Sequence, residues 1–213
     1  SYADGSIETG TDNASDFGTF TVWNKLNIAR VGGSYVKVGC DFTFNTGIVK
    51  NLLDSGLCQM QLRYTISNKG PSGRFQYYVK SNNSDGTTLK TCTTDSNEQT
   101  YTSGWFDVSS SNFYFYCQYY GRTSDVGETT NVGFDIRLKD NLVFSGSGTS
   151  ISPFLLENRA DFDLFAYRII TGTTYANQYF KIQPDNSNSQ NSTYINMLST
   201  EFTPIGTQDS KFQ

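Results

Sequence analysis

The feature that most constrains the fold is a strict alternation of apolar and polar side chains in several segments. The segment YVKVGCDFTFN (35–45) places one apolar row on a single parity: Val36, Val38, Cys40, Phe42 and Phe44. The segment CQMQLRYTIS (58–67) does the same with Cys58, Met60, Leu62, Tyr64 and Ile66. A period of two over this length is typical of half-buried antiparallel strands. The chain is therefore predicted to be an all-β protein.

Further segments alternate in the same way: 20–28, 73–80, 111–120 and 131–140. With weaker candidates they give about eight to ten strands at a spacing near ten residues, which is typical of a sandwich or barrel. One short stretch has helical spacing before Gly56: Ile48, Val49, Leu52 and Leu53. We predict an antiparallel β-sandwich, jelly-roll-like, with one short helix near 47–55.

One β-sandwich domain is expected to span residues 17–204. Residues 1–16 are polar and acidic and are predicted to be an arm or linker, and residues 205–213 a polar tail. The segment SGSGTS (145–150) is a candidate internal break. We expect the sandwich to run through it, because roughly 60 residues alone would make a marginal domain. Three later segments are expected to add strands: 162–170, 175–183 and 192–198.

The charge balance argues against nucleic acid and membranes as partners. The 213 residues include 16 Lys and Arg against 20 Asp and Glu, which gives a net charge of −4 and a pI of about 4.8. Nucleic-acid binding needs clustered basic residues, and the sequence has no such cluster. No apolar run reaches the roughly 18 residues of a membrane span. We therefore expect no nucleic-acid partner and no membrane insertion.

The absence of histidine removes much of catalytic chemistry. A Ser-His-Asp triad, a Cys-His pair and a His-ligated metal are all excluded. Pairs of carboxylates remain an alternative, because a glycosidase needs only two of them at about 5–10 Å. Four acidic residues lie on predicted strands or nearby loops: Asp41, Asp107, Glu128 and Asp135. No local motif marks a pair, so we expect no enzyme activity.

No cofactor is expected, although a structural calcium ion stays open as an alternative. Calcium binds clusters of carboxylate and amide oxygens. Three stretches carry such atoms: Asn82 to Asp85, Asp161 to Asp163, and Asp185 to Asn188. Turns of this composition are also common without any ion.

The four cysteines allow two readings: two disulfides in an oxidising compartment, or four small buried side chains. They are Cys40, Cys58, Cys92 and Cys117. If Cys40 pairs with Cys58, the complementary bridge is Cys92 to Cys117. That bridge would close a loop of about 25 residues and contribute about 3 kcal/mol in the loop-entropy model.

Aromatic side chains on the outward parity are the candidate ligand contacts. In SNFYFYCQYY (111–120), Phe113, Phe115 and Cys117 share the inward parity. The opposite parity carries tyrosines where a solvated strand would usually carry Thr, Lys or Glu. The same parity rule selects Trp23, Tyr78, Tyr114, Tyr116 and Tyr120, and Trp105 is added because it lies beside a predicted turn. These six are the predicted ligand-binding residues. Tyr and Trp stack on sugars and anchor protein interfaces, but a loop, a third layer or another subunit would equally cover such a face.

Two functional hypotheses follow from these patterns. The first is a non-enzymatic recognition domain on a virion or extracellular surface, such as a viral or phage spike, fibre or capsid projection. It would bind a host glycan or protein receptor and would be a homo-oligomer, a dimer or trimer. The second is a structural jelly-roll coat subunit whose tyrosines pack against other copies. A carbohydrate-binding module or glycoside-active sandwich is the third alternative.

Overall fold

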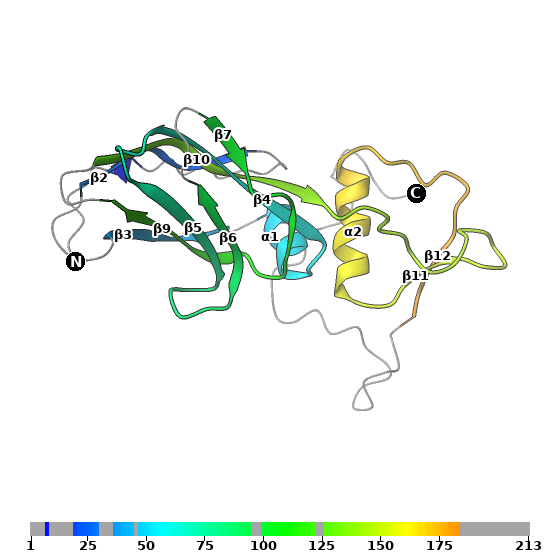
Figure 1. The fold of residues 1–213 in the computed structure, drawn as a ribbon. Coiled ribbons are helices and arrows are strands. Elements are labelled where there is room, and N and C mark those ends of the chain that lie inside the picture. The colour runs from blue at the N-terminus through cyan, green and yellow to red at the C-terminus, as the bar shows by residue number, and fades with distance from the viewer. Residues whose placement is uncertain are drawn as a thin grey trace.

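The computed structural model describes residues 7–8, 19–29, 36–44, 47–94, 99–121 and 126–183, with side chains from position 37 onward except at 126 and 131. The predicted tail and last strand, and the calcium candidate after position 184, lie outside these ranges, and of the predicted arm only Ile7–Glu8 is described. Two β-sheets are stacked in layers, and a smaller helical part lies beyond one end of them (Figure 1).

The first sheet, sheet A, has six strands in the order β1-β2-β10-β4-β7, with β8 also paired to β4. Its strands are β1 (Ile7–Glu8), β2 (Thr19–Ala29), β10 (Val126–Leu138), β4 (Cys58–Asn68), β7 (Gln99–Thr102) and β8 (Phe106–Val108). The second sheet, sheet B, has four strands in the order β3-β9-β5-β6. These are β3 (Val36–Thr43), β9 (Asn112–Tyr120), β5 (Arg74–Ser81) and β6 (Thr88–Thr94). All pairs within both sheets are antiparallel.

The strand order identifies the sandwich as a jelly roll. Without the short β1 and β8, sheet A has the first, eighth, third and sixth strands side by side, and sheet B the second, seventh, fourth and fifth. The chain therefore crosses between the two sheets at almost every step, which produces the nested hairpins of an eight-stranded jelly roll. The predicted all-β sandwich with a short helix is confirmed.

The core lies between the inner faces of the two sheets. Along β4 buried and half-buried residues alternate without a break from Cys58 to Ser67, as the predicted parity requires. The sheets meet through aromatic pairs: Phe115 of β9 lies 5.2 Å from Phe134 of β10, and Tyr64 of β4 stacks on Tyr77 of β5 at 3.9 Å. The inward parity predicted for these four strands is confirmed.

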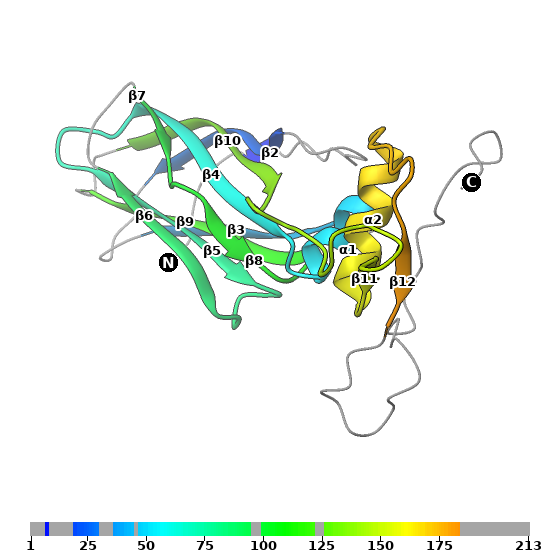
Figure 2. The same cartoon turned by 90° about the vertical axis from the view of Figure 1, so that its right-hand side faces the viewer.

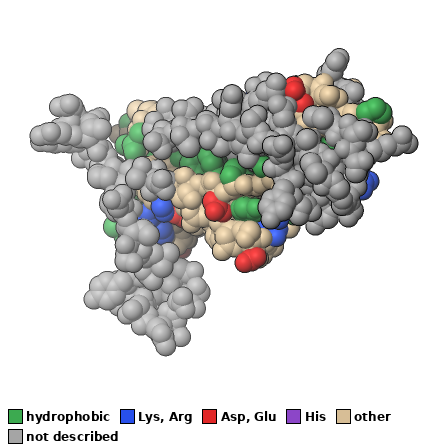
Figure 3. Space-filling view, turned by 90° about the vertical axis from the view of Figure 1, so that its left-hand side faces the viewer, with side chains coloured by type: hydrophobic (Ala, Val, Ile, Leu, Met, Phe, Trp, Pro, Cys, Tyr) green, Lys and Arg blue, Asp and Glu red, His purple; other side chains and the backbone are tan. Residues whose placement is uncertain are grey.

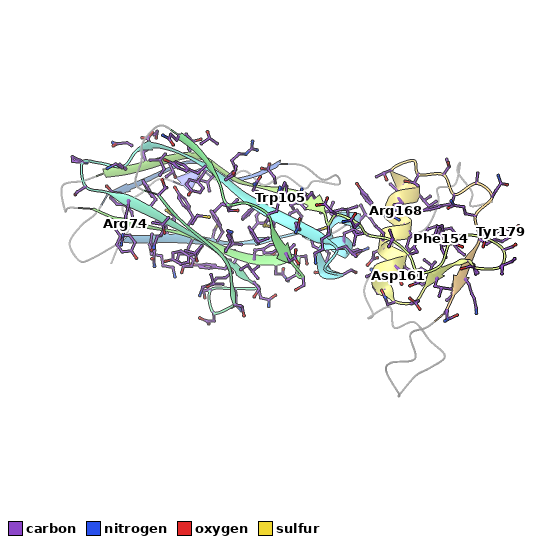
Figure 4. All side chains as sticks on the ribbon, turned by 45° about the vertical axis from the view of Figure 1, so that its right-hand side comes forward. Arg74, Trp105, Phe154, Asp161, Arg168 and Tyr179 are labelled. Atoms are coloured by element: carbon purple, nitrogen blue, oxygen red, sulfur yellow. The ribbon has the colours of Figure 1, made fainter. Side chains whose placement is uncertain are left out.

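Two helices close the end of the sandwich opposite Arg74 (Figures 2 and 4). The helix α1 (Gly47–Asp54) connects the two sheets, and α2 (Arg159–Ile170) lies against it. The junction is polar and buried: Asp163 is 1% exposed, accepts a 2.5 Å hydrogen bond from the Ser55 hydroxyl and pairs with Arg159 at 2.9 Å.

The helix α2 contradicts the strand predicted at 162–170. The Asn158 side chain accepts a hydrogen bond from the Asp161 backbone, and Asp161 accepts one from the Asn158 backbone in return, which is a capping box. At the other end Gly172 has a φ of +91°, a conformation that favours glycine. Beyond α2, only Phe180–Ile182 (β12) of the segment 175–183 is a strand.

The strand β12 pairs in parallel with β11 (Phe154–Leu156), away from the two main sheets. Both belong to a second aromatic cluster beside α2: Phe144, Phe154, Phe165, Tyr175 and Phe180. Figure 4 shows Phe154 and Tyr179 on the side of α2 that faces away from the sandwich. The domain limits predicted at 17 and 204 stay a prediction.

A candidate recognition face on sheet B

The outer surface of sheet B carries four of the predicted aromatic residues. Alternation on β5 and β9 turns Tyr78, Tyr114, Tyr116 and Tyr120 away from the core, together with Gln76 and Gln118. Lys37 from β3 and Arg74 and Lys80 from β5 surround them. We call this surface the tyrosine face.

The tyrosine rings pack on one another across the strands. Tyr78 and Tyr116 are directly opposed in the ladder, and their rings stack at 4.4 Å with an interplanar angle of 10°. Tyr114 lies two residues along β9, 5.7 Å from the Tyr116 ring. Tyr116 is only 7% exposed, so a ligand would reach its ring only if a neighbouring side chain moved.

Gly39 makes room for this packing. It stands opposite Tyr116 on the edge strand β3. A Cβ at this position would lie 2.4 Å from the Tyr114 hydroxyl and 2.8 Å from the Tyr116 Cβ. Only a residue without a side chain therefore lets the two tyrosines cover the backbone of β3.

Positive charges lie over the rings at distances typical of cation–π contacts. The Lys37 Nζ is 4.0 Å from the Tyr116 centroid and 5.6 Å from that of Tyr114. The Lys80 Nζ is 5.9 Å from the Tyr116 centroid, and the Arg74 guanidinium 4.7 Å from that of Tyr120. The ring faces are thus partly occupied by the protein's own cations.

Hydrogen bonds orient the remaining polar groups. The Tyr78 hydroxyl donates to Gln76 Oε1 at 2.8 Å, and the Tyr120 hydroxyl to Gln118 Oε1 at 2.9 Å. Gln76 in turn donates to Thr93 of β6 at 3.1 Å. Burial, followed by the nearby carboxylate of Asp41, raises the pKa of Tyr114, so its hydroxyl is neutral at physiological pH.

The cations on the two outer faces of the sandwich differ in their ion pairing. On sheet A three cations pair with carboxylates: Arg63 with Asp135 at 3.0 Å, Arg137 with Asp140 at 3.5 Å, and Lys139 with Asp107 at 3.2 Å. On the tyrosine face, Lys37, Arg74 and Lys80 form no ion pair within the described part of the chain. An acidic residue on that face, Asp41, stands opposite Tyr114.

The other two predicted aromatic residues lie elsewhere. Trp105 stands on the outer side of sheet A, where the Arg137 guanidinium lies 4.3 Å from its ring. Figure 4 shows it well separated from Arg74. The backbone of Trp23 pairs with Val132 in sheet A, and its side chain lies outside the described part of the structure. The predicted set is therefore not one site: only Tyr78, Tyr114, Tyr116 and Tyr120 come together.

The sequence did not single out the cations of the tyrosine face, because they come from two strands and only the sheet register unites them. Their signal was present in part: Lys37, Arg74 and Lys80 all fall on the outward parity of their strands. Predicting the strand order as well as the parity would have placed them beside the tyrosines.

The acidic residues proposed as an alternative catalytic pair are engaged separately. Asp107 accepts a hydrogen bond from Gln59, which together with Lys139 lowers its pKa, whereas a general acid needs a raised pKa. Asp135 pairs with Arg63, and Glu128 accepts a 2.6 Å hydrogen bond from Ser67. Asp41 lies on the opposite sheet.

The carboxylates proposed for calcium also have protein partners. Asp161 caps α2, and Asp163 is held by Arg159 and Ser55. In the turn after β5, Asn83 Oδ1 accepts a hydrogen bond from the Asp85 backbone. Among the described residues no group of three or more acidic or cysteine side chains is placed to hold a metal ion.

The cysteines are free thiols, and the conditional disulfide pairing is wrong. Cys117 and Cys92 both stand opposite Tyr77, on its two sides, so two strand spacings of about 4.8 Å separate them. Cys40 and Cys58 belong to different sheets. Burial raises the pKa of Cys40 to about 11 and that of Cys58 to about 12, which keeps both thiols protonated and unreactive at neutral pH.

Comparisons with known proteins give no family. No protein-family model and no curated protein sequence matches the chain. A structure of the infectious bursal disease virus Gx strain matches 66% of the chain with 11% identity and a TM-score of 0.31, and the match spans 32% of that virus chain.

Two cowpea mosaic virus structures also match 64% of the chain. An empty virus-like particle gives 9% identity, a TM-score of 0.32 and 85% coverage of the virus chain. Naturally occurring empty particles of the top component give 9%, 0.31 and 91%. Structural similarity at these TM-scores is too weak to assign a fold, so the jelly-roll assignment depends on strand order alone.

Neither helix of the described residues combines the length and the apolar character that a membrane span needs.

Proposed function

We propose that this protein is a non-enzymatic recognition domain and that the tyrosine face is its partner-binding surface. The observation that carries the proposal is the set of three cations, Lys37, Arg74 and Lys80, which lie over tyrosine rings without a carboxylate partner in the described part of the chain. Cations on sheet A have such partners. Charges left uncompensated by the fold are available to a ligand.

The setting proposed is a virion or other extracellular surface, with a host glycan or protein receptor as partner. The jelly roll supports this only by analogy of fold, because viral capsid and lectin domains share it with unrelated proteins. The composition supports it more directly. An acidic chain without histidine, with a tyrosine-rich rigid sheet, is suited to binding rather than to proton transfer.

Binding to receptor-bearing cells or to a glycan array tests the proposal. Replacement of Tyr114 or Tyr120 by Ala should reduce binding to any ligand detected, because both rings are half-buried and part of their surface is open. The matched control is Trp105→Ala, which removes a half-buried aromatic ring from the opposite face. Loss of binding with Trp105→Ala alone would move the site to sheet A and refute the proposal.

The second candidate is a structural coat subunit, and one observation favours it. The large hydrophobic side chains that stand exposed in the described residues all belong to the segment after the sandwich: Val143, Ile151, Ile170, Tyr179 and Ile182. Exposed apolar surface is typical of subunit contacts. Size-exclusion chromatography with light scattering separates the candidates, because a recognition domain gives a discrete dimer or trimer and a coat subunit gives open-ended assembly.

A further inference from the structure

We propose that the tyrosine face binds a linear, negatively charged polysaccharide, one that carries sulfate or carboxylate groups along its length. This inference rests on the proposed function and names its ligand class. It is carried by the spacing of three cations that form no ion pair in the described residues, by the occupation of the tyrosine rings, and by the kinds of side chain that make up the face.

The cations are spread along the face rather than gathered in one pocket. Arg74 and Lys80 lie six residues apart on β5, which corresponds to about 20 Å at 3.3 Å per residue. Lys37 lies on β3, two strands away across β9, at a lateral distance of about 10 Å. The ammonium groups of Lys37 and Lys80 both approach the Tyr116 ring, whereas Arg74 lies over Tyr120. An extended polyanion could therefore contact all three cations, and a single small anion could not.

The packing of the rings argues against a neutral sugar. Stacking on a sugar needs an open aromatic face, but Tyr78 and Lys37 already cover Tyr116, and Arg74 lies over Tyr120. A ligand that approaches from outside therefore meets ammonium and guanidinium groups before it meets ring carbons. Anionic groups complement such a surface.

The other side chains favour a polysaccharide over a protein partner. Protein interfaces usually have an apolar centre. The outward-facing described residues of sheet B include none of Val, Leu, Ile, Met or Phe. Besides the tyrosines and charges they are one glycine and side chains with amides or hydroxyls, such as Gln76, Thr93 and Gln118. Amide and hydroxyl groups can bond to sugar hydroxyls.

Asp41 works against an anionic ligand at one corner of the face. It stands opposite Tyr114, in the same row as Lys80. The positive potential is therefore strongest toward Lys37 and Arg74, and removal of the Asp41 charge should tighten binding. A purely structural role for the face does not predict such a gain.

The test measures binding of the full chain to a size-fractionated heparin oligosaccharide by titration calorimetry, with neutral dextran as the reference sugar. Lys37→Ala and Arg74→Ala should each weaken binding about twofold to fivefold, as expected for an exposed ionic contact. Asp41→Asn should strengthen binding about twofold. Binding should fall as salt rises.

The control variants Lys139→Ala and Lys181→Ala remove the same charge from the position directly after β10 and from β12. If they weaken heparin binding as much as Lys37→Ala, the attraction is not specific to the tyrosine face and the inference fails. Binding of dextran or another neutral glycan through Tyr114 and Tyr120, without heparin binding, refutes the inference but keeps the proposed function. Heparin binding that no face variant alters refutes both. A synthetic peptide of the acidic residues 1–16 that displaces heparin and binds more tightly identifies the chain's own N-terminal segment as the ligand of the face and also overturns the inference.

Discussion

The Tyr119 hydroxyl donates a 2.5 Å hydrogen bond to the backbone carbonyl of Lys69. This contact joins the C-terminal end of β9 to the connection between β4 and β5, at the end of the sandwich away from the helices. Figure 3 views that end, where basic, acidic and hydrophobic side chains lie interspersed among the described atoms. Three glycines leave space around the ring: a Cβ at Gly73, Gly121 or Gly127 would lie within 3 Å of Tyr119 atoms.

Tyr119→Phe should lower the free energy of unfolding by about 1 kcal/mol, because the ring stays buried and only the hydrogen bond is lost. Urea unfolding followed by tyrosine fluorescence measures the change. Tyr179→Phe is the control, because that residue is 55% exposed and should change stability little. Equal effects of the two variants would contradict a specific role of the Lys69 contact.

Gly39→Ala should destabilise the protein by about 1–3 kcal/mol, because the new methyl group overlaps Tyr114 and the Tyr116 Cβ. The double variant with Tyr114→Ala should recover part of this loss, since it removes the closest atoms. A double-mutant cycle from thermal unfolding measures the coupling. If the two substitutions are additive, Tyr114 does not lie over β3 as described.

Asp163→Ala should cost about 3–5 kcal/mol, because it removes a buried carboxylate that pairs with the half-buried Arg159 guanidinium and accepts a hydrogen bond from the Ser55 hydroxyl. Chemical denaturation measures the free energy of unfolding. Limited proteolysis should cleave the variant more readily, because α2 detaches from α1. Lys50→Ala is the control: it breaks an ion pair with Asp54 on the surface of α1 and should cost less than about 1 kcal/mol.

Stability should fall at alkaline pH because of the buried thiols. Folding raises the pKa of Cys58 from 9.0 to about 12, with burial as the main cause. The Cys58 thiol therefore holds its proton more tightly in the folded state than in the unfolded state. This contribution is complete below pH 9.0 and is lost as the pH rises toward 12, at up to about 1.4 kcal/mol per pH unit. Urea unfolding at pH 8, 9 and 10 tests this, and Cys58→Ala should give a shallower decline between pH 9 and 10.

The sandwich could be predicted from sequence because one physical signal, alternation, recurs on every long strand whose side chains are described. The helix α2 could not be found that way, since FDLFAYRII mixes apolar and polar residues without a clean period of either kind. Its boundaries did carry a signal: Asn158 three residues before Asp161, and Gly172 after the last turn. Stronger weight on capping residues would have identified it.

The candidate site could also be predicted only in part. Parity predicted that Tyr78, Tyr114 and Tyr120 face outward, because that is a property of single strands. It did not predict that Tyr116 is covered, because the cover comes from Lys37 and Tyr78 on neighbouring strands. The cysteine pairing failed for the same reason: shared inward parity says nothing about which strand lies between two residues.

The nested strand order has a consequence for how the chain folds. The strand β2 pairs with β10, so Trp23 and Val132 are partners although more than one hundred residues separate them in sequence. Sheet A thus lacks its central strand until the ribosome has released residue 138. Contacts between such distant segments slow folding, and the two sheets stay incomplete and exposed during synthesis. Before that point β2 and β4 have no strand between them. Sheet A is completed only when β10 pairs with both of them.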